Sequence, residues 1–314
     1  MTLHSLCFKL WTFSFWFLLA LTFVVLLVHQ IDYRNSSGIS KSPNIEIFSL
    51  PLDSFDYAEK VCPIQQLGQP TENTSVGSRT DAMLLESLRH KTVAFVGDSR
   101  IRHLCMRLLS ALERIPFLLT SSNNHFHRDR RFYSKEFNTS LKFYWVVYPY
   151  EPRLKKILSR WARTTDPSPH IALFQFGAHS AWFPKHREKE HAYFKDGLTK
   201  TAKALKRIQY SQGTISVWML TLAVNHLKPL TYEPFKWVQN KTVRDYLQLY
   251  AQLGQEIMNS AGVPVWSTAL DATTKYLDLY HDNVHPGPAL LDKFACQLLQ
   301  ALSWNQYGSY GNSG

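Results

Sequence analysis

The chain has 314 residues, of which 45% are hydrophobic and 19% are charged, and this composition excludes a disordered tail, a collagen and a coiled coil. Its 35 Lys and Arg residues outnumber 24 Asp and Glu residues, which gives a formal net charge of +11 and favours acidic partners. Four cysteines are too few to build a small disulfide scaffold, so we expect an ordinary hydrophobic core.

The N-terminal region predicts a membrane anchor. Residues 10–28, LWTFSFWFLLALTFVVLLV, contain no charged side chain, and a helix of this length spans roughly 28 Å, close to the thickness of a hydrocarbon core. A cleaved signal peptide is the alternative, but it usually has a shorter apolar stretch and a cleavage site with small residues. We therefore expect a cytoplasmic tail at residues 1–9 and a transmembrane signal anchor at residues 10–28.

Acceptor sites for N-linked glycosylation favour a lumenal position for the rest of the chain. Four Asn-x-Ser/Thr sequons are present, none with proline at the middle position: Asn35, Asn73, Asn138 and Asn240. Each sequon alone is weak evidence, but sequons are used only in the secretory pathway. Together with the anchor they predict a type II protein of the Golgi membrane with its C-terminal body in the lumen.

Three cysteines follow the anchor: Cys62, Cys105 and Cys296. In an oxidising compartment an odd number leaves at least one thiol without a partner in the same chain, and the sequence does not decide the pairing. No cysteine spacing typical of a zinc site occurs, so we expect no bound metal.

Residues 29–85 are rich in Ser, Asn, Pro and Gly and predict a stem. Residues 86–305 alternate between short apolar runs and amphipathic stretches, and residues 306–314 form a flexible tail. We expect strands at 91–97, 141–149, 170–178, 214–223 and 263–268. We expect helices at 100–113, 152–163, 190–210, 241–260 and 288–303. Such alternation predicts one α/β domain, a three-layer sandwich with a mostly parallel five-stranded sheet.

The first predicted strand leads directly into Gly97-Asp98-Ser99 and a helix. Ligands of open α/β sheets bind beyond the carboxyl ends of the strands, and a helix N-terminus stabilises negative charge. Ser99 is therefore a candidate nucleophile. The alternative is a structural turn in which Ser99 caps the helix.

A second motif, Asp282-Asn283-Val284-His285, lies in a turn-rich loop before the last predicted helix. An Asp three residues before a His can orient the imidazole so that its other nitrogen accepts a proton from a serine. The pair alone is common and uninformative. Combined with Gly-Asp-Ser at a strand end, it predicts a catalytic triad of Ser99, His285 and Asp282.

The segments FVGDSRIR (95–102) and DNVH (282–285) resemble the SGNH/GDSL superfamily of esterases and acyltransferases. More narrowly, they are similar to the lumenal domain of Cas1-domain sialate O-acetyltransferases and to the related glycan O-acetyltransferases and PC-esterases. The resemblance implies an SGNH-like fold and an acetyl-enzyme on Ser99. It also implies acetyl-CoA as the donor and a glycan hydroxyl, most of all one of sialic acid, as the acceptor.

The resemblance further implies an oxyanion hole that includes the Ser99 backbone N–H. Where the superfamily has Gly-x-Asn after the third strand, this chain has Gly177-Ala178-His179. Either the Gly177 backbone or the His179 side chain would then supply the missing donor. The alternative for His179, a solvated or capping loop residue, stays open.

Arg100 and Arg102 begin the helix after the nucleophile, where a cation opposes the helix dipole. We expect them to bind an anionic group of the substrate or donor. Arg102 is favoured because it lies three residues after Ser99, on the same face of a helix. The alternative is a pair of solvated or salt-bridged surface arginines.

Four tryptophans fall near predicted strand ends, where a sugar would bind, although tryptophans more often lie in the core: Trp182, Trp218, Trp237 and Trp266. Two other functions fit the same motifs. One is an esterase that releases acyl groups from glycans or lipids with the same triad, and the other is a non-catalytic glycan-binding protein. We expect an acidic glycan and a membrane as partners, and no nucleic acid.

Overall fold

The computed structural model describes residues 84–115, 117, 127–163, 167–230 and 232–307, all within one compact unit, Ile45–Gly314. The predicted tail, the anchor and the stem up to residue 83 lie outside these residues, as do Asn35, Asn73 and Cys62. None of the described helices is both long enough and apolar enough to cross a bilayer.

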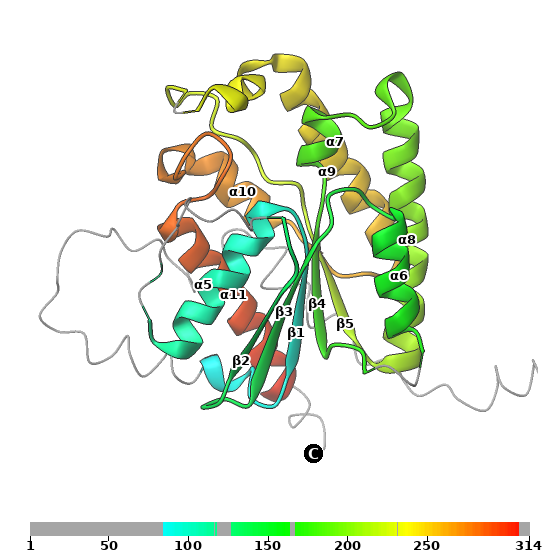
Figure 1. Ribbon diagram of the computed structural model, residues 1–314, viewed down its shortest axis with the longest axis vertical. Helices are drawn as coiled ribbons and strands as arrows, with labels where there is room; N and C mark the ends of the chain where they lie inside the picture. Colours follow the sequence, from blue (N-terminus) through cyan, green and yellow to red (C-terminus); the bar gives the residue numbers. More distant parts are fainter. Residues whose placement is uncertain (1–83, 116, 118–126, 164–166, 231, 308–314) are drawn as a thin grey trace, which may run out of the picture. The chain divides into compact units, whose positions relative to one another are not determined.

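A six-stranded sheet forms the centre of the described fold (Figure 1). The strands are β1 (Thr92–Gly97), β2 (Arg130–Ser134), β3 (Thr139–Trp145), β4 (Ile171–Gln175), β5 (Ile215–Met219) and β6 (Val265–Trp266). Their order in the sheet is β2-β3-β1-β4-β5-β6. All neighbours pair in parallel except β2 and β3, which are antiparallel. The predicted α/β class is confirmed, but the predicted five-stranded sheet is wrong by one strand.

The additional strand, β2, lies at the edge of the sheet. Its residues alternate between half-buried and exposed positions until the buried Ser134, because successive side chains of a strand point to opposite faces of the sheet. Charged residues are common on edge strands, where they discourage pairing with other chains. The basic run at Arg130 and Arg131 therefore conceals a strand that an apolar pattern would have revealed.

Helices cover both faces of the sheet and give the three layers that the sequence predicts (Figure 1). One face is covered by α5 (Ser99–Glu113), α10 (Thr268–Lys275) and α11 (Pro288–Tyr307). The other face is covered by α6 (Pro152–Trp161), α8 (Glu190–Gln212) and α9 (Lys241–Ala261). Short elements at the strand ends are α7 (Ala178–Trp182) and the 3-10 helices η1 (Arg187–Lys189), η2 (Glu233–Gln239) and η3 (Leu277–Leu279). α11 extends two residues into the predicted tail at 306–314.

The central strands are buried on both faces. Val93 and Phe95 of β1 pack in the core beneath α5 and α11, while Ala94 and Val96 pack in the core on the opposite face. All four side chains are fully buried. Burial of one such large apolar side chain stabilises the fold by about 1.5–3 kcal/mol. Double coverage therefore explains why this strand reads as a continuous apolar run.

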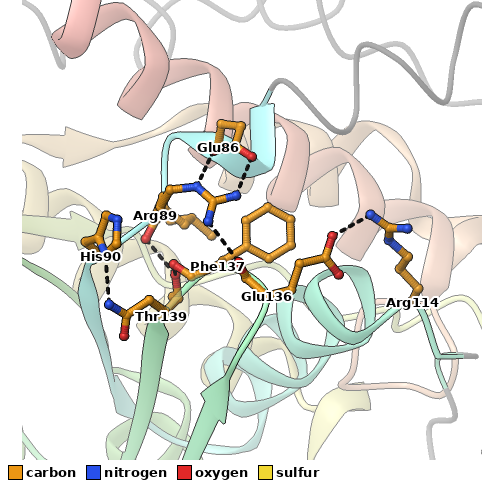
Figure 2. A network of polar contacts seen from close by, with 9 residues as sticks. Glu86, Arg89, His90, Arg114, Glu136, Phe137 and Thr139 are labelled. Carbon is orange, nitrogen blue, oxygen red and sulfur yellow. Dashed lines mark hydrogen bonds and ion pairs between the residues drawn. The ribbon is translucent and has the colours of Figure 1, made fainter.

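A polar network at the amino ends of the strands fixes the segment that precedes β1 (Figure 2). Arg89 donates hydrogen bonds to both carboxylate oxygens of Glu86, at 2.5 and 2.7 Å, and to the carbonyl of Glu136 at 2.8 Å. Its guanidinium lies 5.3 Å from the ring centre of Phe137, and Arg114 pairs with Glu136 at 2.6 Å. These contacts tie the segment before β1 to the turn between β2 and β3.

The two described cysteines differ in state. Cys296 of α11 is disulfide-bonded, to a partner outside the described residues, whereas Cys105 of α5 is a buried free thiol. Burial raises the pKa of the Cys105 thiol, so this group stays protonated and unreactive at neutral pH.

Candidate active site

The direction of the chain's crossovers reverses between β1 and β4. From β1 the chain crosses to β3 on one side, and from β4 it crosses to β5 on the other side. Crevices in open α/β sheets form at such a point, outside the carboxyl ends of the strands. Helix α5, which begins with Ser99, follows β1, and α7, which contains His179, follows β4, so both helices begin at the upper end of the sheet in Figure 1.

Two glycines allow the strand ends to approach closely. Gly97 has φ +156°, and a Cβ there would lie 2.4 Å from the carbonyl oxygen of Gln175. Gly177 has φ +124°, and a Cβ there would lie 2.3 Å from Oγ1 of Thr221. Gly177 therefore has a packing role that does not depend on its predicted role as an oxyanion donor.

Ser99 is the first residue of α5, and Asp98 is its N-cap. The Asp98 carboxylate accepts a hydrogen bond from the backbone N–H of Arg100 at 2.9 Å. The N–H of Ser99 is among the first N–H groups of the helix, which have no carbonyl partner within it. Together with the positive end of the helix dipole, this N–H can stabilise negative charge that develops beside Ser99 Oγ.

Ser99, His285 and Asp282 form a hydrogen-bonded relay. Ser99 Oγ lies 2.8 Å from His285 Nε2, and His285 Nδ1 lies 2.8 Å from Asp282 Oδ2. Because an ionised carboxylate can only accept, this arrangement assigns the imidazole proton to Nδ1 and leaves Nε2 to accept the serine proton. The structure thus brings together two motifs that lie 186 residues apart.

Asp282 is held in its ionised form. Its Oδ1 accepts hydrogen bonds from the backbone N–H groups of Val284 and His285, at 2.7 and 2.8 Å. Burial alone would raise the pKa of Asp282, but the hydrogen bond and charge of His285 and these backbone donors outweigh burial and lower the pKa to about 2. The carboxylate is therefore charged at any physiological pH.

The loop between η3 and α11, which carries the Asp-x-x-His motif, is fixed by Asn283. Its side-chain N–H groups donate to the carbonyls of Asn225 and Lys228 at 3.1 and 2.9 Å, and Asn225 N–H donates to the Asn283 carbonyl at 2.9 Å. Lys228 Nζ donates to the carbonyls of Tyr280 and His281 at 2.9 and 2.8 Å. The segment after β5 therefore positions the loop.

Two rings that belong to neither of the two short motifs contact the His285 imidazole. The ring centre of His103 lies 4.8 Å away, and that of Phe235 lies 5.9 Å away. His103 follows Ser99 by one helical turn, so helical spacing is the signal that could have revealed it. Burial and the charge of His285 lower the pKa of His103 well below its usual range, so His103 is neutral beside the triad.

Arg100 points into the protein. Its side chain is 0% exposed, it donates to the carbonyl of Leu222 at 3.1 Å, and it pairs with Asp98 at 3.5 Å. Substrate binding by Arg100 stays a prediction, and its side chain does not lie at the protein surface. A buried charge needs a partner, and Asp98 provides one.

Arg102 lies beside His103, with a guanidinium nitrogen 3.4 Å from His103 Nε2. The side chain is mostly buried. Burial and the charge of Arg130 on β2 lower the pKa of Arg102 to about 10, so it remains charged at neutral pH. Two guanidinium groups thus lie near one another at this side of α5, and anion binding by Arg102 stays a prediction.

His179 lies in α7 between two indoles. Its ring centre is 6.0 Å from that of Trp145 and 6.0 Å from that of Trp182. Burial lowers the pKa of His179 although the nearby Asp98 opposes this effect, so the imidazole is neutral and has one N–H to donate. Its predicted role in the oxyanion hole stays a prediction.

The four tryptophans near strand ends fall into two pairs. Trp218 and Trp266 are core residues, 2% and 0% exposed. Trp182 is 37% exposed and stacks with Trp237 at 5.3 Å between ring centres. Only the second pair is therefore available at the site.

Both described sequons lie at the surface. Asn240 is exposed and caps α9 by accepting the Thr242 N–H at 2.9 Å. Asn138 is exposed in the turn between β2 and β3, where its amide bonds to His90 and to the Tyr133 hydroxyl. Glycosylation of these residues stays a prediction.

No protein-family model and no curated protein sequence matches the chain. Among solved structures, an α/β-hydrolase enzyme, LAE5, from the metagenome of Lake Arreo in Spain is 12% identical, with a TM-score of 0.43 over 70% of this chain and 98% of its own. The acetylxylan esterase Axe2 from Geobacillus stearothermophilus is also 12% identical, with a TM-score of 0.41 over 70% of this chain and 98% of its own. Because these identities are low, the function of this chain has to be argued from its own side chains.

Proposed function

We propose that this chain is a serine-dependent O-acetyltransferase that moves an acetyl group through an acyl-enzyme onto a glycan hydroxyl. The observation that carries the proposal is the relay from Ser99 through His285 to Asp282, with both hydrogen bonds at 2.8 Å. A serine at the N-terminus of a helix with an oriented imidazole is the arrangement that nucleophilic acyl transfer requires.

In the first step Ser99 Oγ attacks the carbonyl carbon of the acetyl donor, and its proton passes to His285 Nε2. Asp282 stabilises the imidazolium that forms. The Ser99 N–H and a donor from His179 would stabilise the oxyanion. His285 then returns the proton to the leaving group, which for acetyl-CoA is the thiolate of coenzyme A.

In the second step His285 accepts the proton of a sugar hydroxyl, and the sugar oxygen attacks the acetyl-enzyme. Ser99 leaves as the alcohol when His285 returns the proton. If water replaces the sugar, acetate is released. A transferase and an esterase therefore share every step up to the acyl-enzyme.

The acceptor that we propose is an acidic glycan, with sialic acid as the first candidate and acetyl-CoA as the donor. The net charge of +11 supports an anionic partner. Arg102, which lies near the triad and interacts electrostatically with Arg130, also supports an anionic partner.

The location that we propose is the Golgi membrane, in type II orientation, with the catalytic domain in the lumen. The uncharged segment 10–28 supports the anchor. The exposed side chains of Asn138 and Asn240 and the disulfide at Cys296 support an oxidising lumenal compartment.

The test is incubation of the full-length protein with labelled acetyl-CoA and a panel of sialylated and neutral glycans, followed by mass spectrometry. We expect acetylated sialoglycan with the wild type and almost none with Ser99→Ala or His285→Ala, because triad members act as a unit. Free acetate without acetylated glycan would favour the esterase. Glycan binding without turnover would favour the non-catalytic alternative. Turnover above a few per cent in Ser99→Ala would refute the nucleophile.

A further inference from the structure

We propose that Trp145 and Trp182, whose ring centres both lie 6.0 Å from that of His179, form the binding site for the sugar ring that takes part in the reaction. This inference rests on the proposed function, since it assigns a place to the carbohydrate of that reaction. The ligand that we propose is a pyranose ring, which would bind against the flat face of an indole.

The strand register places these residues next to the nucleophile. Trp145, the last residue of β3, pairs with Gly97, and the Val146 N–H donates to the Gly97 carbonyl at 3.1 Å. Gln175 of β4 pairs with Gly97 from the other side, and His179 follows four residues later. Neighbouring strands lie about 4.8 Å apart, so Trp145 and His179 stand on the two sides of the strand that leads to Ser99.

Both indoles meet the imidazole of His179 at an angle. The interplanar angles are 86° for Trp145 and 49° for Trp182, so neither indole is stacked face to face on the imidazole. A second ring lies against each indole: His127 stacks on Trp145 at 4.3 Å, and Trp237 stacks on Trp182 at 5.3 Å. Stacking on one face holds each indole in place, and for Trp182 the exposed part of the ring is available to a ligand.

Exposure supports a binding role for these rings. Trp182 is 37% exposed and Trp145 is half-buried, whereas the core tryptophans Trp218 and Trp266 are almost fully buried. A large aromatic side chain left accessible beside a candidate catalytic centre is typical of a ligand site. Phe183, directly after Trp182, is 68% exposed and extends the apolar surface.

The chemistry of these side chains fits a pyranose ring. One face of such a ring consists mainly of C–H groups, which pack on a flat indole, while the hydroxyl groups project outward and need hydrogen-bond partners. Indole N–H groups and the neutral imidazole of His179 can supply donors beside the aromatic surface. Rigid aromatic rings also lose little conformational freedom on binding.

The aromatic contacts continue to the general base. In η2, Trp237 stacks on Trp182, and two residues earlier Phe235 contacts the ring of His285 at 5.9 Å between centres. One short helix therefore connects the indoles to the imidazole that has to deprotonate the acceptor hydroxyl. A sugar held on Trp182 would therefore lie next to the helix that also contacts His285.

Three variants of the full-length protein test the proposal. Trp182→Ala removes the aromatic face, Trp182→Phe restores a flat ring, and Tyr210→Ala removes an exposed aromatic side chain of α8, 65% exposed, as the matched control. Binding of methyl β-glucopyranoside is measured by ligand-observed NMR. Acetyl release is measured with glucose pentaacetate, which contains a sugar ring, and with 4-nitrophenyl acetate, which does not.

We expect Trp182→Ala to weaken glucoside binding about tenfold, the change that loss of one favourable contact of roughly 1.4 kcal/mol produces. The ratio of kcat/KM for the sugar ester to kcat/KM for the aryl ester should fall by a similar factor. Trp182→Phe should recover most of both losses, and Tyr210→Ala should change neither.

The proposal is overturned if wild type and Trp182→Ala bind the glucoside equally, including the case in which neither binds it. Equal losses on the two esters would also overturn it, because Trp182 would then support the catalytic geometry. Binding of coenzyme A that Trp182→Ala weakens, without any glucoside binding, would overturn the proposal and assign the surface to the donor instead. Failure of the proposed acyl transfer through Ser99 has a different signature, since wild type would then cleave neither ester while the binding measurement would still decide the sugar site. Failure of transfer alone would show as acetate release without acetylated glycan and would leave the sugar-site result unchanged.

Discussion

Replacement of Asp282 by asparagine should affect stability and turnover in ways that can be separated. The folded-state pKa of Asp282 is about 2, below the ordinary value of 3.8, so folding favours the ionised carboxylate. At about 1.4 kcal/mol for each pKa unit, the difference corresponds to roughly 2 kcal/mol. Because the folded-state pKa is the lower one, this stabilisation is present above about pH 4 and is lost as the pH falls towards 2. An asparagine side chain cannot ionise, so the Asp282→Asn variant should be less stable by up to about 2 kcal/mol at pH 7 and by progressively less towards pH 2.

The same substitution should lower kcat by about 10³–10⁴-fold, because an amide does not hold the imidazole in the required tautomer. KM should change little, since Asp282 acts through His285. Urea unfolding at pH 7, 5 and 3 measures the stability difference, and acetate release from 4-nitrophenyl acetate measures kcat. A kcat within tenfold of the wild type, or a stability difference that does not change between pH 7 and pH 3, would refute the assigned role of Asp282.

Three further predictions concern residues around the triad and at the surface. His103→Ala should lower kcat severalfold with little change in KM, because a ring at this position packs against the imidazole of His285. His103→Phe should restore kcat, and its failure to do so would exclude a packing role. Arg102→Ala should lower kcat/KM for a sialylated substrate about tenfold or more, because a charge-assisted contact contributes about 1.5–3 kcal/mol. The fall for the neutral counterpart should be smaller. Steady-state kinetics on the two substrates measures both values, and equal losses would mean that Arg102 is only structural. Enzymatic deglycosylation of protein from mammalian cells should lower its apparent mass. Asn138→Gln and Asn240→Gln should each remove part of that shift. An unshifted band, together with digestion of the protein by protease added to the cytosolic side of sealed vesicles, would contradict the lumenal position.

The alternation of apolar runs and amphipathic stretches is sufficient to predict the parallel part of the sheet and its two helical layers. It is not sufficient to locate strand ends. The strand predicted at 214–223 ends at Met219, yet Leu220 and Leu222 remain buried. An apolar sequence pattern indicates burial rather than strand pairing. Residues that follow the last strand pair of β5 can stay buried, as these two leucines do.

The residues of the candidate site differ in the same way: some belong to short sequence motifs, and others are brought to the site by segments far away in the sequence. Ser99, Asp282 and His285 can be found from sequence because each belongs to a short motif with its own chemistry. Phe235 and Trp145 cannot, because their positions depend on strand register and on a connection far away in sequence. The burial of Arg100 could not be predicted either, because an arginine in a first helical turn normally faces solvent, whereas here the segment after β5 covers it.

The connection from β5 to α9 also contains, within about twenty residues, two sets of contacts that are usually distributed over separate loops. Its first part, with Asn225 and Lys228, anchors the loop of the general base, and its second part, η2, contacts both His285 and Trp182 through Phe235 and Trp237. A change in the length of this connection would therefore alter the contacts of Trp182 and the position of His285 together, whereas point substitutions in η2 would change the ring surface and leave the backbone anchors of the loop in place.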